Sequence, residues 1–219
     1  MRQKIRVAID GPAGAGKSTM AKILAKELNI DYIDTGAMYR AIALKVQRSG
    51  TDYTNSEALD AMLAETRVDY CGGCVYLDGE DVSGLIRTPE ISAMASRTSA
   101  IPAVRDKLSD TQSAMARERS LLMDGRDIGT IIIPDAEFKF YLNANSRVRA
   151  LRRALELREK GLECDLDQVE QEIIARDESD MNRDYHPLKK ADDAMEIDTS
   201  YLTIEEVVNR MMEVIREKF

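Results

Sequence analysis

The hydrophobic positions near the N-terminus first alternate with other residues and then recur at helical spacing. Ile5 to Ile9 alternates and ends at the turn signal Asp10-Gly11-Pro12, which predicts a short strand. From Lys17 to Leu28 apolar residues return every three or four positions, which predicts a helix. Asp31 to Asp34 has the pattern of a second strand, and Thr35 is expected to cap the helix after it. This order of elements indicates a parallel α/β sheet.

The middle of the chain has a different pattern. Between Val68 and Val82, hydrophobic residues alternate with polar ones on both sides of Gly72-Gly73, which predicts small antiparallel strands inserted into the α/β core. Helical spacing then runs from about Glu90 to Arg117 and is interrupted at Pro102.

The rest of the chain returns to alternating strands and helices, and no apolar run approaches the roughly 20 residues that cross a bilayer. The pattern indicates one core domain with insertions. The predicted strands are Leu121–Asp124, Ile131–Ile133, Phe138–Leu142 and Ala194–Ile197, and the predicted helices are Arg147–Lys160, Leu166–Arg183 and Thr203–Lys218.

Composition narrows the chemistry. The chain has 31 Lys and Arg, 39 Asp and Glu, a net charge of −8, three cysteines and one histidine, His186. Ser-His-Asp catalysis and multi-histidine metal sites need imidazoles that are almost absent. The acidity argues against a protein that coats nucleic acid or an anionic membrane, although a local cationic pocket is compatible with it. Met1 to Lys4 leads straight into the first strand without a signal-peptide pattern, so we expect a cytoplasmic protein.

The strongest motif lies between the first predicted strand and helix. It fits G-x-x-x-x-G-K-[ST], in which glycines let successive backbone N–H groups point at phosphate oxygens and the helix start adds a positive dipole end. Lys17 would reach the β- and γ-phosphates, and the Ser18 hydroxyl would ligate Mg²⁺. The sequence therefore predicts a nucleoside triphosphate site. Its residues are Gly11, Pro12, Ala13, Gly14, Ala15, Gly16, Lys17, Ser18 and Thr19.

This motif occurs in several classes of protein, so further signals are needed. The sequence has no Asn-Lys-x-Asp segment of the kind with which GTPases read guanine, and it is short for a motor or an AAA-type ATPase. A compact kinase for a small acceptor remains, and such an enzyme needs an acceptor site and a lid that excludes water.

Several further segments carry a specific resemblance in the right order along the chain. They are Asp10–Thr19, Asp34–Arg40, Gly79–Ser83 with Ile86–Thr88, Asp124–Thr130, Arg176–Arg183, Pro187-Leu188 and Ala191–Ala194. Together they resemble the segments of bacterial cytidylate kinases, which are nucleoside-monophosphate kinases.

The resemblance implies a three-layer P-loop fold with a five-stranded parallel core sheet, an inserted antiparallel monophosphate-binding subdomain and a short helical lid. The core would be about 1–35, 118–146 and 184–219, the monophosphate-binding region about 36–117 and the lid about 147–183. It also implies transfer of the γ-phosphoryl group of ATP, with Mg²⁺, to CMP or dCMP. We expect a monomer that binds these nucleotides but neither nucleic acid nor membrane.

The resemblance also implies roles for individual residues. Asp127 can accept the N4–H of cytosine, and uracil reverses the hydrogen-bonding pattern at that edge, so polar discrimination is strong. Lys17, Arg126, Arg152 and Arg153 are expected to act in catalysis. The expected CMP-binding residues are Thr35, Gly36, Tyr39, Arg40, Ser96, Arg105, Arg126, Asp127, Arg176, Asp180 and Arg183.

Considered without the resemblance, these residues have structural explanations. Thr35 would be a helix cap, Arg40 a solvated helix residue and Ser96 a surface residue of a helix. Arg105 would pair with a nearby acid, and Asp127 would favour a turn in Gly-Arg-Asp-Ile-Gly. The resemblance favours the functional interpretation of each.

Two charged features allow two interpretations. Arg147, Arg149, Arg152 and Arg153 put four cations in seven residues, which fits a lid face over transferring phosphates or a solvated helix face. Asp124 closes an apolar run and would either organise Mg²⁺ through water or end a strand.

Two other features are expected to have no chemical role. Cys71-Gly72-Gly73-Cys74 looks like a metal or redox motif, but Gly-Gly between strand residues favours a hairpin turn. His186 precedes Pro187, which favours an extended backbone. Two alternatives to the main hypothesis remain: a P-loop kinase for another pyrimidine nucleotide or shikimate, and a regulatory switch that hydrolyses ATP slowly or not at all.

Overall fold

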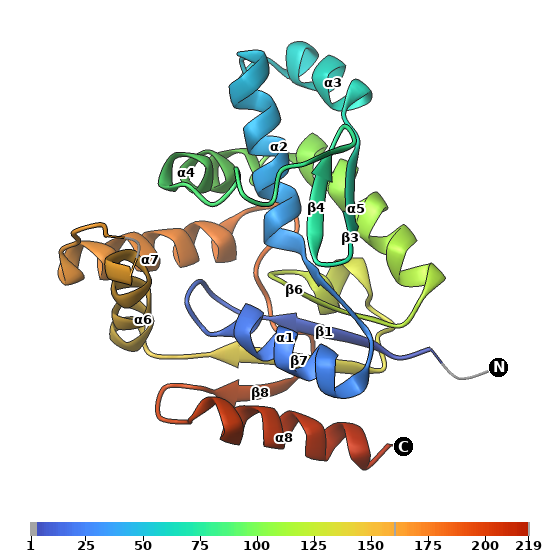
Figure 1. The fold of residues 1–219 in the computed structure, drawn as a ribbon, viewed down its shortest axis with the longest axis vertical. Helices are drawn as coiled ribbons and strands as arrows, with labels where there is room; N and C mark the ends of the chain where they lie inside the picture. Colours follow the sequence, from blue (N-terminus) through green and yellow to red (C-terminus); the bar gives the residue numbers. More distant parts are fainter. Residues whose placement is uncertain (1–3, 160, 219) are drawn as a thin grey trace. The chain divides into compact units, whose positions relative to one another are not determined.

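The computed structural model describes residues 4–159 and 161–218 (Figure 1). Their internal contacts divide the chain into two units: unit 1 is Met1–Ile30 with Ser120–Phe219, and unit 2 is Asp31–Arg119. The predicted lead-in at Met1 to Gln3 and the predicted helix end at Lys160 lie outside the described residues.

Unit 1 carries most of a five-stranded parallel sheet with the strand order β2-β6-β1-β7-β8, in which β2 (Asp31–Asp34) is an edge strand. This confirms the predicted fold class. The other elements are β1 (Arg6–Asp10), α1 (Lys17–Leu28), β6 (Leu121–Gly125), η1 (Ile128–Ile132), β7 (Phe138–Asn143), α6 (Ser146–Glu159), α7 (Leu166–Asn182), β8 (Met195–Asp198) and α8 (Ile204–Arg216).

Buried apolar strands form the centre of unit 1. Val7 to Ile9 in β1 and Leu121 to Met123 in β6 are fully buried, as expected for parallel strands covered on both faces. Helix α8 buries one apolar stripe, and its start is fixed by a capping box between Thr203 and Glu206. Asp10 is in register with Gly125 and Tyr141, so the segments that follow the parallel strands β1, β6 and β7 all leave the sheet at the carboxyl ends of its strands.

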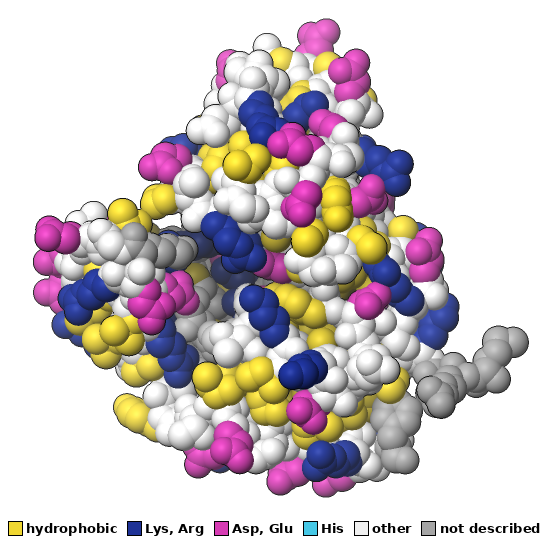
Figure 2. Space-filling view, in the orientation of Figure 1, with side chains coloured by type: hydrophobic (Ala, Val, Ile, Leu, Met, Phe, Trp, Pro, Cys, Tyr) yellow, Lys and Arg dark blue, Asp and Glu magenta, His cyan; other side chains and the backbone are white. Residues whose placement is uncertain are grey.

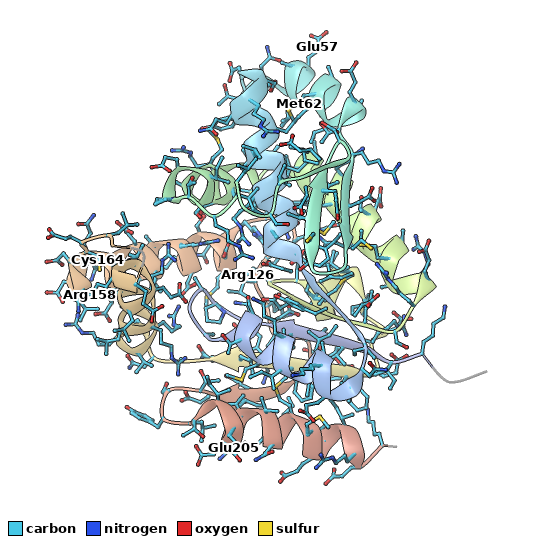
Figure 3. All side chains as sticks on the ribbon, viewed as in Figure 1. Glu57, Met62, Arg126, Arg158, Cys164 and Glu205 are labelled. Carbon is cyan, nitrogen blue, oxygen red and sulfur yellow. The ribbon has the colours of Figure 1, made fainter. Side chains whose placement is uncertain are left out.

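Helices α6 and α7 contact each other and lie side by side, with Arg158 and Cys164 marking their connection (Figure 3). They enclose a small apolar cluster of Ala150, Val169 and Ile173.

Unit 2 contains the predicted antiparallel insertion. Cys71 lies opposite Cys74, and the intervening Gly72 and Gly73 have left-handed φ angles of 59° and 82°, so the hairpin prediction is confirmed. The elements of this unit after β2 are α2 (Thr35–Ser49), α3 (Ser56–Glu65), β3 (Val68–Cys71), β4 (Cys74–Leu77), β5 (Glu80–Asp81), α4 (Pro89–Thr98) and α5 (Pro102–Glu118).

Three local features differ from the sequence predictions. Thr35 is the first residue of α2 rather than its cap, because the Asp34 carboxylate accepts the Ala37 N–H at 2.8 Å. The run Ile131–Ile133 is not a strand; η1 is a π-helix whose carbonyls accept i+5 N–H bonds. Helix α3, which Asn55 caps, has no counterpart among the predicted elements.

Acidic and basic side chains are interspersed over the face drawn in Figure 2. Over residues 4–159 and 161–218, no helix combines the length and apolar composition needed to cross a membrane.

Candidate active site

The glycine-rich loop connects β1 to α1 and passes close to β7. A Cβ atom on Gly11 would lie 2.0 Å from the Leu142 carbonyl oxygen, so this close approach requires glycine. Gly14 and Gly16 adopt left-handed φ angles of 73° and 85°, which a side chain would strain. Gly16 is the N-cap residue of α1 and makes no side-chain hydrogen bond to the first amides of the helix. This geometry suits an anion.

Lys17 is buried at the first position of α1. Its Nζ donates to the Pro12 carbonyl at 2.7 Å, which holds the ammonium against the loop. Burial lowers the pKa of Lys17 well below its ordinary value, and the positive charges of Arg126 and Arg176 act in the same direction. An anion beside this group would favour its charged form again.

Ser18 and Asp124 bring together two side-chain oxygen atoms of the kind that bind metal ions. The Ser18 hydroxyl donates to Asp124 Oδ2 at 2.8 Å, and Asp124 is only 5% exposed at the end of β6. A hydroxyl beside a carboxylate is the kind of donor set that Mg²⁺ accepts, usually together with water and phosphate oxygens.

Asp10 organises the turn after β6. Its two carboxylate oxygens accept the N–H groups of Ile128 and Gly129 at 2.8 and 2.7 Å, and these residues begin η1. Burial raises the pKa of Asp10 to about 7, although both hydrogen bonds act against this shift. Asp10 thereby fixes the backbone beside Arg126 and Asp127.

Arg126, labelled in Figure 3, belongs to an ionic network with α7. Its Nε donates to Asp180 Oδ2 at 3.0 Å, and Arg183 Nη1 donates to the other carboxylate oxygen at 3.2 Å. Burial opposes ionisation of Asp180, but the charges of Arg126, Arg176 and Arg183 outweigh it and hold the pKa below its usual range. The structure therefore brings four of the predicted acceptor residues together in unit 1.

Asp127 is 3% exposed and lies beside the single histidine. His186 Nδ1 is 3.4 Å from Asp127 Oδ2, and its ring stacks on Tyr185 at 4.1 Å. The residue is not extended as predicted, because its φ is 53°; its carbonyl accepts from Arg183 Nε at 2.5 Å in this conformation. His186 thus belongs to the network of Arg126, Asp180 and Arg183, for which the sequence predicts no role of this histidine.

The arginines of α6 have separate partners. Arg152 donates to the Thr199 hydroxyl and carbonyl at 3.0 and 2.6 Å, and the Thr199 hydroxyl lies 3.2 Å from the Ala15 carbonyl. Arg152 is thus placed beside the glycine-rich loop. Arg153 instead pairs with Glu156 of the same helix at 3.1 Å.

The remaining predicted acceptor residues lie in unit 2. Arg40 pairs with Asp34 at 3.1 Å, and a Cβ on Gly36 would lie 3.2 Å from both side chains, so a larger residue there would require this pair to shift slightly. Arg105 is 2% exposed, and its guanidinium lies 5.3 Å from the centre of the Tyr39 ring.

Helix α5 and the end of α4 fix the orientation of Arg105. Its Nη1 donates to the Ser99 carbonyl at 2.9 Å. Ser96 is half-buried on α4, and its carbonyl accepts the Ser99 hydroxyl. Thr35 is buried at the start of α2.

For two residues of the site, Asp10 and Asp177, the sequence predicts no individual role, and for Arg149 it predicts only membership of the arginine group on the helix 147–160. Asp10 lies inside a motif, but nothing in the sequence indicates that it accepts bonds from residues more than a hundred positions away. The cysteine motif forms the β3–β4 turn of unit 2. Among the described residues, no group of three or more His, Cys, Asp or Glu side chains is arranged to hold a metal ion.

Comparison with protein families matches residues 7–217 to the family described as Cytidylate kinase. A cytidylate kinase of Caldicellulosiruptor saccharolyticus is 50% identical over 97% of this chain and 96% of that protein. Those of Lactobacillus johnsonii and Geobacter sulfurreducens are each 47% identical, over 98% and 99% of this chain and 95% of each relative.

Solved structures show the same fold at low sequence identity. An uncharacterized protein from Eubacterium ventriosum has a TM-score of 0.57 at 12% identity and covers 97% of this chain and 99% of its own. Shikimate kinase from Bacteroides thetaiotaomicron has a TM-score of 0.51 at 14% identity and covers 97% of this chain and 98% of its own.

Proposed function

The chain belongs to the cytidylate kinase family, and we propose that it transfers the γ-phosphoryl group of ATP to CMP and dCMP, giving ADP with CDP or dCDP. The observation that carries this proposal is the loop from Gly11 to Ser18. It offers uncapped amides, a buried lysine and a hydroxyl–carboxylate pair at one sheet edge. These are the elements that phosphoryl transfer requires.

On the donor side, the amides from Gly14 to Ser18 would surround the phosphates of ATP. Lys17 would exchange its bond to the Pro12 carbonyl for a phosphate oxygen, and the phosphate charge would restore its ammonium form. Ser18 and Asp124 would hold Mg²⁺, directly or through water. When bound, Mg²⁺ neutralises charge on the phosphate oxygens.

On the acceptor side, the chain offers arginines for phosphate and polar groups for the base. In unit 1 we assign Arg126, Arg176 and Arg183 to phosphate, Asp180 to the ribose hydroxyls and Asp127 to the N4–H of cytosine. The residues of unit 2 that we propose for CMP are Thr35, Gly36, Tyr39, Arg40, Ser96 and Arg105.

The chemistry needs little proton transfer. A phosphate oxygen of CMP is already an anion, so the side chains have to position reactants and neutralise charge rather than act as a strong base. Lys17, Arg126 and Arg152 are the cations that we propose for this role, with Arg153 as a further lid residue of segment 147–183. The presence of one histidine in the chain is compatible with this mechanism.

A coupled assay of ADP release tests the proposal against its alternatives. CMP and dCMP should each stimulate ATP turnover strongly, whereas UMP, AMP and shikimate should stimulate it less. Stimulation by shikimate or AMP alone would contradict the proposed acceptor, and turnover that no acceptor changes would favour a regulatory ATPase. We also propose that the enzyme is a monomer and acts in the cytoplasm. Light scattering of the purified protein checks the monomeric state.

A further inference from the structure

A buried ion pair connects helices α6 and α7, and the chemistry proposed above does not use it. Arg149 is 7% exposed and Asp177 is 5% exposed, and the guanidinium donates directly to Asp177 Oδ2. Burying two charges costs free energy that their attraction often does not return, so a buried pair is weak evidence for a purely stabilising role. The position of this pair therefore needs another explanation.

Both ions bind the same residue of the glycine-rich loop, Ala13, through its two flanking peptide groups. Asp177 Oδ1 accepts the Ala13 N–H at 3.1 Å, and Arg149 Nη1 donates to the Ala13 carbonyl at 2.9 Å. Arg149 Nε also donates to the Ala144 carbonyl at 2.8 Å, which fixes the guanidinium between the loop and the end of β7. A Cβ on Gly14 would lie 3.0 Å from Arg149 Cβ, so the loop runs closely against α6.

The same two helices carry a second ionic connection that provides a comparison. Arg147 of α6 binds Asp167 and Glu170 of α7, but its side chain is 46% exposed and its bonds go to these carboxylates. An exposed pair of this kind contributes little stability. The buried pair differs from it in its bonds to the loop, and these bonds suggest a role in positioning.

We propose that Arg149 and Asp177 are positioning residues for ATP. By holding both polar groups of Ala13, the pair sets the direction in which the following amides, from Gly14 onward, present their N–H groups. Arg149 also neutralises a carboxylate that would otherwise stand beside the loop and repel a triphosphate. The inference rests on the proposed function only in that the loop binds ATP.

Single and double variants separate this role from a structural one. Arg149→Met leaves the Asp177 charge uncompensated, so the Kd for ATP should rise by about tenfold or more, while the KM for CMP changes by less than about twofold. Adding Asp177→Asn should restore part of the ATP affinity, because the asparagine oxygen still accepts the Ala13 N–H without a charge. Arg147→Met is the matched control and should leave the Kd for ATP unchanged.

Calorimetric titration of ATP into the whole chain without any acceptor gives the Kd for ATP of each variant. The melting temperature of each variant is measured alongside it. ATP binding is thus measured even if CMP proves not to be the acceptor, so the two proposals fail separately. If Arg149→Met does not fold, the double variant still tests the pair against Arg147→Met. Wild-type ATP affinity in the variants, equal losses for ATP and CMP, or no recovery in a folded double variant would overturn the proposal.

Discussion

Asp10 is a carboxylate in the protein interior that serves as a double acceptor. It is 4% exposed, and its bonds to Ile128 and Gly129 determine where η1 begins. Burial raises its pKa to about 7, the Asp127 charge raises it further, and the Lys17 charge lowers it. The folded protein therefore holds a proton on Asp10 at pH values where the unfolded chain has released it.

This linkage predicts a pH-dependent stability. The folded pKa lies above the unfolded one, so the contribution of Asp10 to stability is complete below about pH 4 and is lost as the pH rises to about 7. Asp10→Asn removes this titration. Urea unfolding across the window should show that the wild type loses up to about 1.4 kcal/mol per pH unit relative to the variant.

The exposed Asp60 on α3 supplies the control for this experiment. Asp60→Asn should keep the wild-type slope of unfolding free energy against pH. Parallel slopes in the wild type and Asp10→Asn would contradict the assignment.

At Asp127 the prediction concerns the base of the acceptor. Asp127→Asn keeps one oxygen that accepts a cytosine amino group but adds a donor that suits the O4 atom of uracil. The ratio of kcat/KM for CMP to that for UMP should fall by about tenfold or more. An unchanged ratio would remove Asp127 from base recognition, and the exposed Asp60→Asn variant controls for a general loss of activity.

Among the elements, the β3–β4 hairpin requires glycine at Gly73 because of the backbone conformation of its turn, and not because a side chain would lack room. Gly73 has a φ of 82°, and no atom lies within 4 Å of a Cβ added there. Gly84 has equally open surroundings but no left-handed φ. An alanine side chain would therefore meet no neighbour at either position, and only at position 73 would it strain the backbone.

Gly73→Ala should destabilise the protein by about 1 kcal/mol relative to Gly84→Ala, which should be neutral or slightly stabilising. Urea unfolding of the two variants measures the difference directly. Equal unfolding free energies would mean that the turn relaxes without cost.

The elements also show how far hydrophobic periodicity alone is informative. The bounds of α1 and β2 agree with the prediction because a strong apolar pattern lies between clear turn signals. The strand prediction for Ile131–Ile133 was wrong because a three-residue apolar run fits several structures. The hydrogen bonds that Ile128 and Gly129 donate to Asp10 instead fix the start of the π-helix. At α2 the hydroxyl of Thr35 and the carboxylate of Asp34 both suit a cap, and the choice depends on where the helix starts.

Across the whole molecule, contacts between residues that are distant in the sequence could not be predicted from local patterns. Asp177 binds a loop residue 164 positions away, and no local pattern marks it. The family resemblance includes the segment Arg176–Arg183, in which Asp177 lies. The carboxylates of Asp177 and Asp180 differ through their partners in the fold, which are Ala13 for Asp177 and Arg126 for Asp180. The net charge of −8 likewise describes the surface, while Lys17, Arg126 and Arg176 form a cationic site in unit 1.

The most direct test of the central claim follows the phosphoryl group itself. ATP labelled in its γ-phosphate is incubated with the enzyme, Mg²⁺ and CMP or dCMP, and the products are separated. The account predicts that the label appears in CDP or dCDP in amounts equal to the ADP formed, and that Lys17→Ala abolishes most of this transfer. Label found only in inorganic phosphate, or no transfer to either cytidine nucleotide, would contradict it.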